Sequence, residues 1–172
     1  WHRAWAHPIV LERRKSEAER FRDFERDGDL VLTAEMADAE HELAEVVAGI
    51  ERAGLLDKVG VDPYGIGSIM DALVAAGVPK DKIIGISQGW KLGAAIKTTE
   101  RALAGGTLVH GGSPLMSWCV GNARVEPKGN AILITKQASG TAKIDPLMAL
   151  FDAVSLMALN PAAPATPQLI FV

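Results

Sequence analysis

The chain has 172 residues, of which 48% are hydrophobic, so it can bury the core of one globular domain but is too short for two ordinary ones. Its 18 lysines and arginines against 21 acidic residues give a formal net charge of -3. This charge argues against binding nucleic acid by bulk positive charge, and it leaves open a local basic strip or bound metal ions.

Cys119 is the single cysteine, which excludes an intramolecular disulfide and fits a reducing, cytoplasmic setting. Its apolar neighbours in LMSWCVGNA favour a small core residue over a catalytic thiol. No apolar run approaches the roughly 20 residues that span a bilayer, and WHRAWAHP is not a signal peptide. We therefore expect a soluble chain. A start at Trp1 without an initiator methionine favours a piece of a longer protein.

The amino-terminal part predicts two helices separated by a short extended segment. LERRKSEAERFRDFERDG, residues 11–28, is a charged surface helix whose main apolar contacts are Phe21 and Phe24. After LVLT (30–33), apolar residues recur at helical spacing up to Gly54, with Asp38 as a plausible cap.

Two strand and helix units follow, and a third short strand after them. The predicted strands are KVGVD (58–62), KIIGIS (82–87) and TLVH (107–110), and the helices cover 66–76 and 90–104. This alternation is typical of parallel crossovers and predicts an α/β sheet.

The carboxyl-terminal part is more helical. It predicts a helix over 114–120, a strand over 130–136 and an apolar, buried helix over 144–159, before a proline-rich and alanine-rich extension at 161–172.

Asp62, in KVGVDPYGIG, ends a predicted strand. Ligands gather at the carboxyl ends of strands in open α/β sheets, which favours a metal ligand or general base. Helix capping or a turn before Pro63 would also explain this aspartate. A dinucleotide loop is poorly supported, because Met70 occupies the third glycine position of GxGxxG.

Asp145 precedes the apolar helix in KIDPLMALFDAV, and it is either a site residue or an N-cap with Pro146 at the first helical position. Asp152, about two turns further on, shares its helix face. Unpaired buried carboxylates are costly, and divalent cations would account for two on one face.

Other motifs are weaker. There is no Walker A sequence, and the histidines have no metal-ligand spacing, so zinc is not expected. His110 ends a predicted strand, where a structural role is favoured. Ser87 lacks the GxSxG setting of a hydrolase nucleophile.

Five segments in order carry a resemblance: WAHPIVLERR, VGVDPYG, LVHGGSPLMSW, GNARVEP and TAKIDPLMAL. Together they resemble the nuclease domain of the large terminase subunit of tailed phages and prophages, over roughly residues 5–160. The resemblance implies an RNase H-like mixed sheet flanked by helices. It also implies an endonuclease that cuts concatemeric double-stranded DNA during genome packaging in the bacterial cytoplasm.

The resemblance also implies a site. Asp62 and Asp145 match the second and third acids of the family, which hold two divalent ions, Mg²⁺ or Mn²⁺. Asp152 is a candidate additional ligand. Lys136 and Lys143 flank the loop QASGTA and are candidate DNA phosphate contacts, with simple solvation as the alternative.

The chain also departs from the family. The first acid of the family lies on a strand upstream of the WAHP segment, with no counterpart here, and Asp29 opens its strand at the wrong end to replace it. We therefore expect residues 1–160 to form the nuclease domain without its first strand. The ATPase domain, the small terminase subunit and the portal are the protein partners that the resemblance implies.

Three hypotheses remain from the sequence. The first is a metal-dependent endonuclease, inactive if the first acid is indispensable. The second is a non-catalytic prophage remnant that docks packaging partners and binds no metal. The third is a nucleotide-binding α/β domain.

Overall fold

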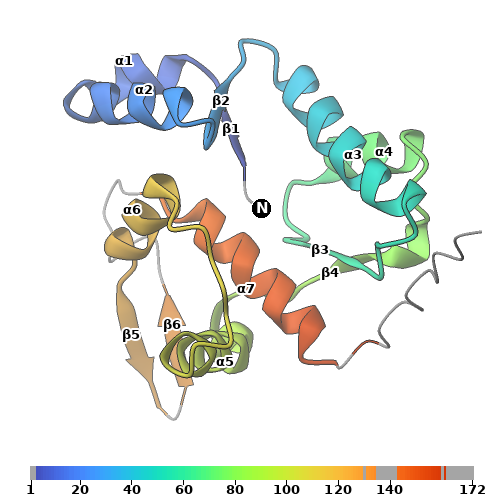
Figure 1. The fold of residues 1–172 in the computed structure, drawn as a ribbon, viewed down its shortest axis with the longest axis vertical. Coiled ribbons are helices and arrows are strands. Elements are labelled where there is room, and N and C mark those ends of the chain that lie inside the picture. Colours follow the sequence, from blue (N-terminus) through green and yellow to red (C-terminus); the bar gives the residue numbers. More distant parts are fainter. Residues whose placement is uncertain (1–2, 130, 135–142, 160, 162–172) are drawn as a thin grey trace, which may run out of the picture.

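The computed structural model describes residues 3–129, 131–134, 143–159 and 161. Helices and short strands alternate along the chain, and the strands pair in both parallel and antiparallel fashion. The α/β class is confirmed, and within the described ranges the strands pair as separate two-stranded sheets (Figure 1). No helix in these ranges is long and apolar enough to cross a membrane.

The amino-terminal unit contains two short parallel strands and a helical hairpin. Its elements are β1 (Ala4–Ala6), α1 (Ile9–Arg13), η1 (Lys15–Glu17), α2 (Ala18–Arg26) and β2 (Leu30–Leu32). The single helix predicted over 11–28 is wrong, because Arg14 leaves the helical region at φ -127° and ψ 54°. Phe21 and Phe24 are buried, as predicted.

The next unit is the predicted parallel crossover. It comprises α3 (Met36–Arg52), β3 (Val59–Val61), α4 (Gly67–Ala75), η2 (Lys80–Lys82) and β4 (Ile83–Gly85). Val61 lies opposite Gly85, and the amide of Ile86 donates to the carbonyl of Val61 at 2.8 Å. Asp38 lies inside the first turn of α3 and is not its cap, since the helix begins at Met36.

The last unit contains η3 (Gly89–Leu92), α5 (Gly93–Ala104), α6 (Pro114–Asn122), β5 (Val125–Lys128), β6 (Ala131–Ile134) and α7 (Asp145–Met157). The strand predicted over 107–110 is wrong. The amides of Thr107 and Leu108 both donate to the carbonyl of Ala102, at 2.9 and 3.1 Å, so they close the end of α5. The strand predicted over 130–136 is β6, with Asn130 and residues 135–136 outside the described ranges.

Helix α7 crosses the centre of the molecule (Figure 1) and contacts β3, α5 and α6. Leu147 and Phe151 lie in the larger hydrophobic cluster, whereas Met157 and Leu159 are exposed. The predicted burial of this helix therefore holds for its middle and fails at its end. A smaller cluster lies between α3, α4, β3 and β4.

Candidate active site

A cleft of about 670 Å³ opens beside the ends of β3 and α7. Asp62, Asp145 and Asp152 all line it. Asp62 follows one of two adjacent parallel strands, and the other two acids lie on the helix that packs against that strand. The acids predicted from the sequence therefore come together in one cleft. Its further lining includes Arg3, Trp5, Gly60, Ile66, Gln88, Gly89, Ile134 and Met148.

Asp62 is exposed in the turn between β3 and α4. Its Oδ1 accepts a hydrogen bond from the amide of Tyr64 at 3.1 Å, the local turn that aspartate favours. Helix α4 begins at Gly67, with Ile66 at its cap position. The alternative of a turn is thus correct and that of a helix cap is wrong, and the turn holds the carboxylate at the edge of the cleft.

Asp145 is the first residue of α7 and is exposed. The cap position belongs to Ile144, whose dihedrals of φ -135° and ψ 12° are not helical, and no side chain caps the helix. The predicted N-cap role of Asp145, with Pro146 at the first helical position, is therefore wrong. Ile144 holds the cap position, and Asp145 and Pro146 are the first two residues of the helix. A carboxylate in the first turn is still favoured by the helix dipole.

Asp152 is buried, with 5% of its surface exposed. Gln88 Nε2 donates to its Oδ1 at 2.9 Å and to the carbonyl of Ile86 at 3.0 Å. Burial raises the pKa of Asp152, the bond from Gln88 lowers it, and the negative charge of Asp62 raises it. Both carboxylates line the same cleft, so the charge of Asp62 disfavours ionisation of Asp152.

Gln88 is the site residue that the sequence analysis missed. It lies just beyond β4, at the sheet edge where Asp62 lies beyond β3. The rule that placed Asp62 at the carboxyl end of a strand would also have found Gln88, had it been applied to the next strand.

The cleft offers carboxylate and amide oxygens, the ligand chemistry that suits Mg²⁺ or Mn²⁺. Asp62 and Asp145 are the exposed acids that could hold such an ion, and Asp152 is a buried acid that lines the same cleft. Within the described ranges, no three His, Cys, Asp or Glu side chains lie close enough to form a complete metal cluster. The donor chemistry therefore fits a divalent ion, although these residues do not close a three-ligand set.

The other candidates lie elsewhere. Lys143 is exposed beside a neighbouring depression, and Lys136 lies outside the described residues. Asp29 is buried against the start of α6, where its Oδ2 accepts from Ser113 Oγ at 2.5 Å and from the Leu115 amide at 3.1 Å. Its contacts are those of a structural residue.

Two further side chains have structural settings. Cys119 is buried, and burial together with the charge of Asp145 raises its pKa to about 12, which keeps the thiol protonated, as expected for a core residue. His110 Nδ1 accepts from the amide of Gly112 at 3.2 Å, a local contact within its own loop.

The comparisons with known proteins agree with this α/β fold. Residues 9–160 match the family described as the terminase large subunit, endonuclease domain, and the chain belongs to this family. The crystal structure of the HK97 bacteriophage large terminase is similar over 88% of this chain, with a TM-score of 0.71 and 23% sequence identity. The matched region is 32% of that terminase chain, and the similarity concerns the fold. No curated protein matches the chain.

Proposed function

We propose that this chain is the divalent-metal-dependent endonuclease domain of a phage or prophage terminase, and that it cleaves concatemeric double-stranded DNA during genome packaging. Asp62 and Asp145 are the proposed ligands of Mg²⁺ or Mn²⁺, with Asp152 as an additional one. The observation that carries the proposal is that these three carboxylates line one cleft at the end of a parallel strand pair. Membership of the endonuclease family supports DNA as the substrate.

When bound, divalent ions supply an activated water and stabilise the charge on the leaving oxygen of a phosphodiester. The residues of the chain orient the carboxylates that would hold these ions. The Tyr64 amide orients the carboxylate of Asp62, and the start of α7 fixes Asp145 at the same cleft. Asp62 and Asp152 line the same cleft, so a divalent cation held there would offset the negative charge that disfavours ionisation of Asp152.

The partners are also part of the proposal. The chain covers 32% of the HK97 large terminase chain, so the activity of a whole terminase exceeds what this domain alone would perform. We propose an ATPase domain, a small terminase subunit and a portal as its partners, in the cytoplasm of a bacterial host.

The test combines a calorimetric titration with Mn²⁺ and a supercoiled-plasmid nicking assay. Asp62→Asn and Asp145→Asn keep the side-chain shape and remove the charge, so each should weaken Mn²⁺ binding at least about tenfold and abolish nicking. Asp71→Asn, on an exposed position of α4 away from the lining of the cleft, is the matched control and should change neither. Full nicking by Asp62→Asn would refute the assignment.

The lack of a three-ligand cluster within the described ranges favours a second candidate, a non-catalytic remnant that docks packaging partners. This candidate predicts no Mn²⁺ binding by the unsubstituted chain and no effect of either aspartate substitution. The same titration therefore separates the two candidates.

A further inference from the structure

A second depression, of about 560 Å³, lies beside the acidic cleft. We call it the basic groove, and its polar lining consists of Trp5, His7, Arg13, Arg14, Ser16, Glu17 and Lys143. It draws on β1, the hairpin of α1 and η1, and the segment just before α7. The first three elements are consecutive in the sequence, and the fold brings Lys143, from far along the chain, next to their cationic side chains.

The basic groove and the acidic cleft share one lining residue. Trp5 lines both, and its Nε1 donates to Glu42 Oε2 at 2.8 Å, which fixes the ring as their common wall. Lys143 lines the groove and Asp145 lines the cleft. Two residues of chain span at most about 7 Å, so the two sites are adjacent.

The charge of the groove is opposite to that of the cleft. Arg13 and Lys143 are both exposed. Arg14 pairs with Glu17 at 3.1 Å, so these two charges largely cancel. His7 Nδ1 accepts from the amide of Ile9 at 3.0 Å, which leaves Nε2 to donate. A chain with a net charge of -3 thus presents a cationic surface next to its cluster of acids.

We propose that the basic groove binds the phosphate backbone of duplex DNA beside the phosphate at the acidic cleft, with Arg13 and Lys143 as the contacting cations. A DNA strand carries a phosphate about every 3.4 Å along the helix axis, so phosphates within a few nucleotides of the cleft reach the groove. This inference rests on the proposed nuclease function for its substrate. It assigns a role to α1 and β1, which the candidate active site does not explain.

The test measures the salt dependence of DNA binding. Fluorescence anisotropy of a labelled duplex is recorded with the chain in EDTA, which prevents cleavage, over a series of KCl concentrations. Arg13→Gln combined with Lys143→Gln should weaken binding and reduce the slope of log K against log salt by about two, because each phosphate contact contributes about 0.9. Both side chains are exposed, so the fold should tolerate the changes.

The matched control is Lys97→Gln combined with Arg101→Gln, which removes the same charge from exposed positions of α5. It should leave the slope within about 0.3 of its original value, since no phosphate contact is lost. Equal slopes for the two double variants would refute DNA binding by the groove. Absence of duplex binding by the unsubstituted chain would refute it as well. An acidic protein segment would then be the better occupant of the groove.

The outcomes also distinguish failure of the DNA-binding proposal from failure of the nuclease proposal. Asp62→Asn should keep the full salt slope, because it removes no cation. A chain that shows the slope change but neither binds Mn²⁺ nor nicks DNA would support the groove and refute the nuclease. A chain that nicks DNA, with a slope that the groove substitutions do not alter, would refute the groove alone.

Discussion

At the scale of single residues, Asp152 is the costly feature of the cleft. It is 5% exposed, and both burial and the neighbouring Asp62 raise its pKa, while one bond from Gln88 lowers it. When the pKa of a carboxyl group is higher in the folded chain than in the unfolded chain, ionisation of that group lowers the free energy of unfolding. Stability therefore falls as pH rises from the ordinary aspartate value through the raised folded value.

Asp152→Asn should raise the free energy of unfolding at pH 7 in a metal-free buffer and flatten this fall with pH. The amide oxygen can still accept from Gln88 Nε2, and no charge remains to be buried. Urea unfolding followed by circular dichroism between pH 4 and pH 8 would measure the effect. A variant that is less stable than the original chain at pH 7 would contradict the prediction.

Gln88→Leu is the complementary change. It removes the donor to Asp152 and to the carbonyl of Ile86 and leaves a buried carboxyl group with less support. The free energy of unfolding at pH 7 should fall by about 1–3 kcal/mol. In the Asp152→Asn background the loss should be smaller, because a neutral amide is cheaper to leave unpaired.

The local place of each acid could be predicted from the sequence, whereas their convergence depends on the packing of α7 against β3 and was expected only from the family resemblance. The end of a parallel strand places Asp62, and helical periodicity places Asp152 on the face of Asp145. The basic groove could not be predicted in this way. Trp5, Arg13 and Lys143 share no element or period, and only the packed chain brings them together.

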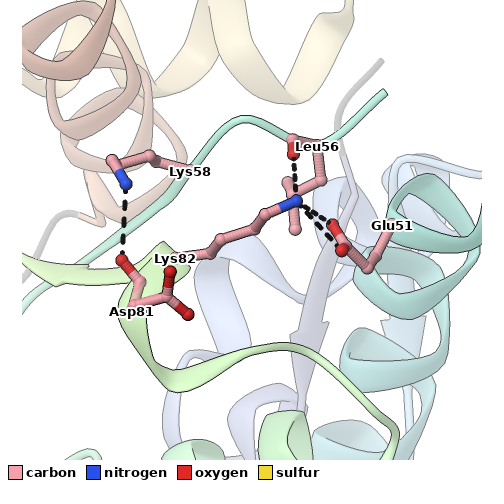
Figure 2. A network of polar contacts seen from close by, with 5 residues as sticks. All are labelled: Glu51, Leu56, Lys58, Asp81 and Lys82. Carbon is pink, nitrogen blue, oxygen red and sulfur yellow. Dashed lines mark hydrogen bonds and ion pairs between the residues drawn. The ribbon is translucent and has the colours of Figure 1, made fainter. Parts of the chain in front are cut away.

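At the scale of elements, Lys82 links segments on either side of the β3–α4–β4 crossover (Figure 2). Its Nζ donates to both carboxylate oxygens of Glu51, at 2.9 and 2.7 Å, and to the carbonyl of Leu56 at 2.8 Å. These contacts tie the end of α3 and the loop before β3 to η2. The side chains of Lys82 and Glu51 are 28% and 22% exposed, so water screens the pair only in part.

Lys82→Met should lower the free energy of unfolding by about 1–2 kcal/mol, because Glu51 and the carbonyl of Leu56 each lose a charged donor while the apolar stem is kept. Lys58→Met is the matched control within the same network (Figure 2). Lys58 is exposed, and its Nζ donates to the carbonyl of Asp81 at 3.4 Å. This change should stay within about 0.5 kcal/mol. Equal losses in urea unfolding would contradict the role of Lys82.

The elements were predictable where a helical period was long, as in α3, or where short strands alternated with helices, as in β3 and β4. Helix α3 and the parallel strands β3 and β4 have the type and position expected from their apolar patterns. Two other predictions failed for local reasons. The predicted helix over 11–28 breaks at Arg14, and the amides of Thr107 and Leu108 close the end of α5 instead of pairing in a sheet.

At the scale of the whole molecule, α7 and β3 form the junction between the two hydrophobic clusters. Phe151 of α7 belongs to the larger cluster, and Val59 and Val61 of β3 pack against the smaller one. Gly60 lies between these valines and lets the helix approach the strand closely. This long-range contact positions Asp152 and Asp62 at one cleft, so the site depends on the packing of the two clusters.

Gly60→Ala tests this junction. A Cβ there would lie 3.0 Å from Ile86 Cγ1, 3.2 Å from Leu156 Cδ1 and 3.3 Å from the carbonyl oxygen of Asp152. Because that oxygen belongs to the backbone of α7, relief requires the helix to move. The free energy of unfolding should fall by about 1–3 kcal/mol, and Mn²⁺ binding should weaken as Asp152 shifts.

Gly49→Ala separates this packing effect from the general effect of replacing a glycine. Gly49 lies inside α3, and its nearest new contact would be the guanidinium of Arg52 at 3.9 Å. Alanine in a helix interior is favoured over glycine by roughly 0.5–1 kcal/mol, so this variant should be more stable in urea. Opposite signs for the two substitutions would support a close contact between α7 and β3. A neutral Gly60→Ala would mean that the helix adjusts freely, and that the spacing of the acids is not set by this contact.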